Sequence, residues 1–290
     1  MQIFFYILFF VVGACMGSFL CCQARRLHLR QGKKKRSKLS PRSICLHCKK
    51  QLKWYDNLPI LSWLTLRGRC RYCHRKIGIA EFLSELLGGI ALLVVFVSFD
   101  YAVSAGGSPT FFGVFPPQDV TSSFYSIAPA NYLLLFATVV FVFVLFFLAI
   151  YDGLYGELPT LFLTIAIIIA CIILAIRTYS VISLASFSPE LIWQPLLSVA
   201  FFGGLYLVLY LISKGKWVGD GDWLLATAVS LALASPYLTL IALFLTNFLA
   251  SAIMLPTMKS SKTHKIHLGP FMVAAFAIVL AFSGPLMSVF

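Results

Sequence analysis

The chain has 290 residues, of which 60% are hydrophobic and 11% are charged, and its mean hydropathy is +0.91. A soluble globular chain carries about 25% charged residues, so this composition excludes an ordinary soluble protein and indicates a polytopic membrane protein. The net charge is +13, yet 17 of the 23 lysines and arginines lie between Arg25 and Lys76. Basic residues concentrate on the cytoplasmic side of membranes, so we expect this stretch to be cytoplasmic. It contains no recognisable nucleic-acid module, and we expect no nucleic-acid partner.

Eight apolar runs predict eight transmembrane helices, with both chain ends on the outer side. The runs span residues 2–22, 82–99, 132–151, 160–178, 193–213, 223–235, 237–255 and 267–289. The first is too long for a signal peptide and its charges lie on the wrong side, while small residues along one side of it predict a close helix–helix contact. The sixth is short, which fits a tilted or partly buried helix. This topology places 22 of the 23 basic residues inside, with Arg177 as the exception.

The segments between the runs support this topology. Residues 100–130 lack lysine and arginine and are rich in glycine, serine, proline and aromatic residues, so we expect an outside loop. Lys259, Lys262 and Lys265 indicate an inside loop before the last run.

Four of the eight cysteines form two CxxC pairs inside the basic stretch. They are Cys45, Cys48, Cys70 and Cys73, with 21 residues between the pairs. Two such pairs can supply a closed tetrahedral set of thiolates, which is typical of structural zinc, although the usual separation is about 15–20 residues. Disulfides are disfavoured in a reducing cytoplasm. We therefore expect a structural zinc ion, with unligated cysteines or a redox pair as the alternatives, and we expect His47 and His74 to be surface residues.

Two carboxylates stand at the edges of apolar runs, where an ionisable group is costly and is therefore a candidate for function. Asp152 ends the third run, and Asp222 lies in the stretch Gly219-Asp220-Gly221-Asp222 before the sixth. Two aspartic carboxyl groups a few ångströms apart share one proton, so that one activates water and the other protonates the leaving nitrogen of a peptide bond. Taken singly, a helix cap at Asp152 and a tight turn at 219–222 are the alternatives. Because the predicted topology places both aspartates at the same level of the membrane, the pair together predicts a catalytic site.

The residues around the pair suggest how a substrate is handled. Gly219 and Gly221 allow the backbone to turn and to approach a substrate strand closely. Asp220 is the rival carboxylate within the motif, and Glu157 is an alternative partner for Asp152. Because proline favours a helix start, Pro159 predicts that residues 153–158 form a short loop.

These motifs together resemble the type IV prepilin peptidases, which are GxGD intramembrane aspartyl proteases. The resemblance covers nearly the whole chain. It rests on the GxGD stretch at 219–222, the D-x6-P spacing from Asp152 to Pro159, the cysteine pairs, Gly17-Ser18-Phe19, the D-N-x-P-x-x-S-W segment at 56–63, the G-x-C-R segment at 68–71, Glu85 and Gly269-Pro270-Phe271. The chain departs from the family pattern at Leu224, where the family usually has lysine, and at His267-Leu268, where Pro-Phe is common.

The resemblance implies a multi-pass protein of the bacterial cytoplasmic (inner) membrane, with its active site at the cytoplasmic face. Its partners would be the lipid bilayer and prepilin or pseudopilin substrates, whose basic leader is cleaved after glycine by Asp152 and Asp222. Asp220 and Glu157 would act locally on that leader. Family members with the cysteine domain also methylate the new amino terminus with S-adenosylmethionine. Glu85 would then belong to the cofactor-binding region, whereas a carboxylate favoured by a helix start is its alternative reading.

We therefore predict an all-α polytopic membrane protein of about eight transmembrane helices with a small cytoplasmic zinc-binding insertion. The first transmembrane helix is 1–22, the cytoplasmic four-cysteine zinc-binding domain is 23–78, and the transmembrane aspartyl peptidase domain is 79–290. Two other functions stay open. A membrane scaffold whose zinc domain docks a partner would not need the aspartates. A presenilin-like protease, to which the Tyr151-Asp152 pair is similar, would cut within an apolar segment.

Overall fold

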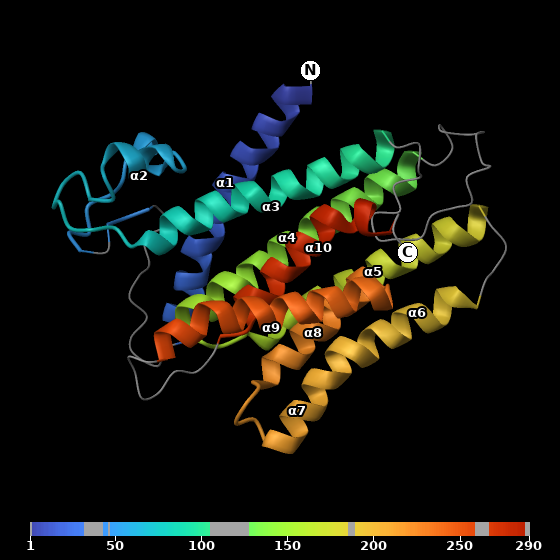
Figure 1. Ribbon diagram of the computed structural model, residues 1–290. Helices are drawn as coiled ribbons and strands as arrows, with labels where there is room; N and C mark the ends of the chain where they lie inside the picture. The colour runs from blue at the N-terminus through green and yellow to red at the C-terminus, as the bar shows by residue number, and fades with distance from the viewer. Residues whose placement is uncertain are drawn as a thin grey trace. The chain divides into compact units, whose positions relative to one another are not determined.

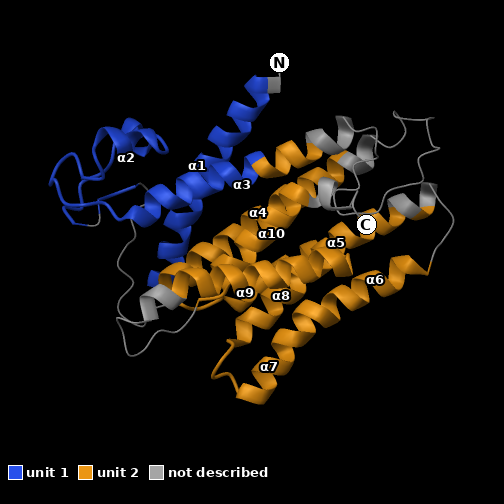
Figure 2. Ribbon diagram, in the orientation of Figure 1, with its two compact units in different colours: residues 1–93 blue, residues 94–290 orange. Residues whose placement is uncertain are grey.

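The computed structural model describes most of the chain as helix. The described residues are 2–31, 43–45, 47–104, 128–184, 189–258 and 267–287. Within these ranges there is no β-strand, only two isolated β-bridges. Most of the predicted outside loop at 100–130, and the three lysines of the predicted inside loop, lie outside the described residues. The chain forms two compact units, residues 1–93 and 94–290 (Figure 2).

The first unit contains two long helices and the cysteine-containing segment. Its elements are α1 (Gln2–Gln31), the 3-10 turn η1 (Trp54–Asn57), α2 (Leu61–Thr65) and the first part of α3 (Ile79–Ser104). α1 and α3 pack through glycines, as the small residues of the first run predict: a Cβ on Gly88 would lie 2.7 Å from the carbonyl oxygen of Gly13 and 3.0 Å from the Cα of Gly17. The two backbones therefore approach closely where neither helix carries a side chain.

The second unit is a helix bundle. After the remainder of α3 it comprises α4 (Ala128–Tyr155), α5 (Thr160–Leu184), α6 (Glu190–Val199), the π-helical turn η2 (Ala200–Gly204), α7 (Leu205–Ser213), α8 (Asp220–Leu233), α9 (Pro236–Met258) and α10 (Gly269–Met287). α8 packs against α5, α6 and η2 (Figure 1), and nine of its 14 residues are buried. The helix that carries the Gly-Asp motif is therefore an internal element of this unit.

The predicted membrane spans correspond closely to these helices. By length and composition, six helical stretches of the described chain are able to cross a membrane: α1, α3, α4, α5, the continuous stretch from α6 to α7, and α9. The described apolar part of α10 (Gly269–Phe282) is shorter. α8 has 14 residues, or about 21 Å at 1.5 Å per residue, against a hydrocarbon thickness of about 30 Å. The prediction of an all-α, multi-pass membrane protein is confirmed, and the sixth span is short and buried.

The loop predicted at 153–158 is partly wrong, because α4 continues to Tyr155. Gly156 ends the helix: its φ is +69°, and its N–H donates to the carbonyl oxygen of Asp152 at 2.8 Å. A glycine in this left-handed conformation is the common way to close a helix, because it has no Cβ to clash. Asp152 consequently lies in the last turn of α4, where the helix fixes the direction of its side chain.

Candidate active site

Asp152 is a buried carboxylate held by the start of α10. Only 5% of the residue is exposed, and its Oδ2 accepts a hydrogen bond of 2.9 Å from the N–H of Gly269. A Cβ on Gly269 would lie 2.7 Å from the same oxygen, so the close approach requires glycine there. On the other side of the carboxylate, Nδ1 of His267 lies 3.7 Å from Oδ1. The local sequence around Asp152 gives no sign of this histidine contact, which joins residues 115 positions apart.

Asp222 is the third residue of α8 and is also buried, with 8% of it exposed. Its Oδ2 accepts a hydrogen bond of 2.9 Å from the N–H of Gly219, which precedes the helix in an extended conformation. An acidic residue at this position commonly reaches back to the N-cap in this way. The motif is therefore a helix start rather than the tight turn of its alternative reading, and the capping contact engages Asp222 through one oxygen and keeps its carboxylate at the buried end of the helix.

The two aspartates lie near enough for their charges to interact. Both are buried, and two buried carboxylates in electrostatic contact do not both ionise readily. The structure therefore brings together the two residues that the sequence paired, although their catalytic role stays a prediction.

The other residues predicted at this site lie in different surroundings. Asp220 and Glu157 are exposed, so within the motif the structure separates a buried from an exposed aspartate. Gly221 packs against Leu158, since a Cβ on Gly221 would lie 2.6 Å from the Cβ of Leu158. Gly219 supplies the N–H that binds Asp222. Their proposed contact with a substrate stays a prediction.

The four cysteines form two similar turns whose sulfur atoms converge. All four Sγ atoms lie within 4.8 Å of one another, and those of Cys45 and Cys73 are 3.9 Å apart. Tetrahedral zinc with Zn–S bonds of about 2.3 Å requires sulfur atoms about 3.8 Å apart. In each turn the first cysteine N–H donates to the carbonyl five residues later: Cys45 to Lys50 at 3.0 Å and Cys70 to Arg75 at 2.9 Å. The donor set therefore fits a structural metal ion, and His47 and His74 are exposed as expected.

Glu85 joins three parts of the first unit. It is buried in α3, its Oε1 accepts the hydroxyl proton of Ser18 in α1 at 2.7 Å, and its Oε2 accepts the N–H of Ile60 at 2.7 Å. Ile60 precedes α2 with a φ of +64°, a strained value for a β-branched residue. Both carboxylate oxygens thus have protein donors, and the carboxylate holds the D-N-x-P-x-x-S-W segment against the helix pair. Its participation in cofactor binding stays a prediction.

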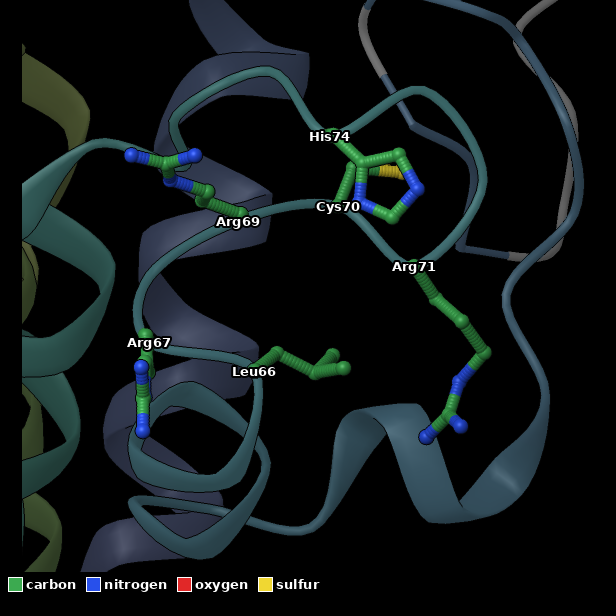
Figure 3. A pocket seen from close by; sticks show the side chains of 6 residues that line it. All are labelled: Leu66, Arg67, Arg69, Cys70, Arg71 and His74. Atoms are coloured by element: carbon green, nitrogen blue, oxygen red, sulfur yellow. The ribbon is translucent and has the colours of Figure 1, made fainter.

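A basic pocket lies beside the second cysteine pair. It has a volume of about 380 Å³, and its lining residues are Leu66, Arg67, Arg69, Cys70, Arg71 and His74 (Figure 3). Figure 3 shows the three arginine side chains pointing in different directions, and Nε of Arg71 contacts the Asp56 carboxylate at 2.8 Å. The three arginines do not converge on one point, and Arg71 is paired with Asp56, so the pocket does not form a focused anion site.

Comparison with known proteins confirms the resemblance for the first third of the chain. Residues 11–99 match the family described as Bacterial Peptidase A24 N-terminal domain. A prepilin leader peptidase/N-methyltransferase of Myxococcus xanthus is 45% identical over 86 residues, which are 30% of this chain and 24% of the relative. Its Vibrio cholerae counterpart is 49% identical over 47 residues (16% and 19%). A type 4 prepilin-like proteins leader peptide-processing enzyme of Escherichia coli is 50% identical over 54 residues (19% and 20%).

These matches span about a quarter or less of the relatives' length. The family match covers the cysteine segment and α1 from residue 11 onward, whereas both aspartates lie outside residues 11–99. No solved structure matches the chain. The geometry of α4, α8 and α10 therefore carries the argument for the peptidase site.

Proposed function

We propose that the chain is a membrane aspartic endopeptidase. It cleaves the leader of prepilins or pseudopilins after glycine at the cytoplasmic membrane face of the bacterial inner membrane. The observation that carries the proposal is the pair of buried carboxylates, Asp152 at the end of α4 and Asp222 at the start of α8, in two helices that both pack against α5 and α10. The names of the relatives support the class of substrate.

The chemistry follows from one proton shared between two carboxyl groups. The ionised member takes a proton from water as the water oxygen attacks the peptide carbonyl, and the protonated member donates to the nitrogen that leaves. Two backbone N–H groups, from Gly269 and Gly219, each bind the Oδ2 of one aspartate. These bonds hold both side chains in place before the substrate arrives, which lowers the reorganisation needed during the reaction.

Substrate binding is expected to depend on the apolar helix of the pilin rather than on its leader. A basic leader is repelled by a protein with a net charge of +13, so the favourable free energy must come from apolar contacts in the membrane. The exposed carboxylates of Asp220 and Glu157 offer local attraction for the leader, weakened by solvent screening. A glycine before the scissile bond lets the substrate backbone approach the carboxylates closely.

We further propose that the first unit methylates the new amino terminus. The support is the match over residues 11–99 and the relatives whose names include N-methyltransferase. S-adenosylmethionine would supply the methyl group. Zinc bound by the four cysteines would hold the two turns together, and Glu85 would hold the segment between them against α1 and α3. This arrangement would keep the first unit folded during transfer of the methyl group to the new amino terminus.

The test is cleavage of a co-expressed model prepilin with a basic leader that ends in glycine. Wild type, Asp152→Asn, Asp222→Asn and the control Glu190→Gln, an exposed carboxylate at the start of α6, are compared by gel shift, and mass spectrometry identifies the new amino terminus. We expect wild type and the control to cut after glycine, both other variants to be inactive, and the product to carry one methyl group. Cleavage by both variants would instead favour the scaffold, and a cut within the apolar segment would favour a presenilin-like protease.

A further inference from the structure

His267 contacts the same carboxylate that α10 binds. Its Nδ1 lies 3.7 Å from Oδ1 of Asp152, while the N–H of Gly269, two residues later, binds Oδ2 at 2.9 Å. One short segment therefore touches both oxygens of a single aspartate. The Asp152 side chain is 6% exposed, whereas the His267 side chain is 35% exposed. The imidazole can thus exchange protons with solvent while it faces a buried carboxylate.

The position of the ring is defined by the glycine that ends α4. A Cβ on Gly156 would lie 2.5 Å from Cε1 of His267 and 3.0 Å from its Nδ1. The imidazole therefore packs over the backbone at Gly156, four residues after Asp152 in the chain. This packing holds the ring beside the carboxylate and leaves little room for it to turn away.

Other ionisable groups surround the site, but His267 is distinguished among them. The neighbouring elements carry Tyr151, Asp152 and Tyr155 on α4, Glu157 after it, and Asp220 and Asp222 on α8. These groups are acidic or phenolic. Within the described residues, no lysine or arginine forms an ion pair with Asp152 or Asp222. Among the described residues, His267 is therefore the group whose contact with Asp152 can place a positive charge next to the pair.

We propose that His267 is a third ionisable residue of the peptidase site, and that its protonated ring keeps Asp152 ionised as the base while Asp222 carries the shared proton. The inference rests on the proposed peptidase function. A cation beside one member of a carboxylate pair favours the charged form of that member. Asp152 then takes a proton from water, the water oxygen bonds to the peptide carbon, and the carbon–nitrogen bond breaks as Asp222 donates its proton to the nitrogen. Proton exchange with solvent restores the pair.

This role has a distinctive dependence on pH. Histidine is the side chain whose charge commonly changes between about pH 5 and 8, and its protonated form dominates at the acidic end. A positive charge beside the pair opposes the binding of a second proton, which would leave no base. Removing that charge should therefore reduce activity at acidic pH more than at alkaline pH.

The experiment measures cleavage of the model prepilin by the purified full chain between about pH 5 and 8. It compares wild type, His267→Gln, His267→Lys and the control His28→Gln, a histidine of α1. For His267→Gln we expect the ratio of the rate at pH 5.5 to the rate at pH 8 to fall about tenfold relative to wild type, since one charge acts through a partly solvated contact. His267→Lys should restore the ratio, because lysine is charged throughout this range, and the control should match wild type.

The ratio does not depend on the folded fraction when that fraction is equal at both pH values, and the thermal midpoint of each variant measured at both pH values verifies this. An unchanged ratio in His267→Gln, or an equal loss at all pH values in His267→Gln and His267→Lys, would overturn the proposal and leave the peptidase function intact. Absence of cleavage by wild type would contradict both the proposed role of His267 and the proposed peptidase function.

Discussion

Gly221 offers a test of how the packing of α8 positions Asp222, the residue that follows it. A Cβ on Gly221 would lie 2.6 Å from the Cβ and 2.9 Å from the Cδ1 of Leu158. Carbon atoms in favourable contact are about 3.5–4.0 Å apart, so an alanine requires the start of α8 and the loop at Leu158 to separate by about 1 Å. Leu158 belongs to the loop that joins α4 to α5, and the separation would therefore widen the site itself.

The two consequences of this shift differ in size. Overpacking of this kind costs about 1–3 kcal/mol of stability, which most folded proteins tolerate. A displacement of about 1 Å at a catalytic group costs about 100-fold in rate. Gly221→Ala should therefore yield a folded protein whose cleavage rate is about 100-fold lower, with the loss in kcat more than in KM because the apolar substrate contacts remain.

The matched control is Gly153→Ala. This glycine follows the other aspartate, but a Cβ there would meet only the Cγ of Pro270, at an ordinary distance of 3.6 Å. Its helical position makes alanine neutral or slightly stabilising, so activity should stay close to wild type. The assay is cleavage of the model prepilin in detergent, with the thermal midpoint of each variant measured on the same preparation. Equal rates for both variants, or a lower midpoint with unchanged kcat for Gly221→Ala, would refute the reasoning.

Three further predictions concern residues outside the carboxylate pair. Purified protein should contain about one zinc ion per chain, and Cys45→Ser should lose it and make the first unit sensitive to protease, as metal analysis and limited proteolysis would reveal. Glu85→Ala should lower the free energy of unfolding by about 1–3 kcal/mol because it leaves buried donors without an acceptor. Ser18→Ala removes one hydrogen bond and should lower it by less. Equal midpoints of thermal unfolding for these two variants would contradict this prediction. Arg177→Met should lower the thermal midpoint because it removes the donor 3.1 Å from the carbonyl of Leu233, and Arg177→Lys should recover part of the loss.

The sequence predicts the helices well because the length of an apolar run is a direct physical constraint in a membrane. The predicted run 160–178 lies within α5 (Thr160–Leu184), and 237–255 lies within α9 (Pro236–Met258). Helix ends are less predictable. α1 continues to Gln31 although the apolar run stops at residue 22, because no glycine or proline interrupts the polar residues that follow.

The contacts that define the site are harder to read from sequence, because they join distant parts of the chain. The local pattern identified Asp152 and Asp222, but it did not reveal that the segment at 267–269 binds Asp152 on both oxygens. The family resemblance likewise implied cofactor binding for Glu85 and did not reveal its hydrogen-bond donors in α1 and before α2. Periodicity and spacing describe one helix at a time, whereas these bonds depend on which helices pack together.

The short length of α8 and the unusual position of Arg177 have a common explanation. Carbonyl groups at the end of a helix need donors, and within a membrane water cannot supply them. α8 ends after 14 residues at Leu233, and the buried guanidinium of Arg177 donates to the carbonyl of that residue. The cation also lies at the negative end of the helix dipole, while Asp220 and Asp222 lie at the positive end. Arg177 is thus the exception to the predicted inside placement of basic residues because its guanidinium binds the end of the helix that carries the candidate catalytic aspartate.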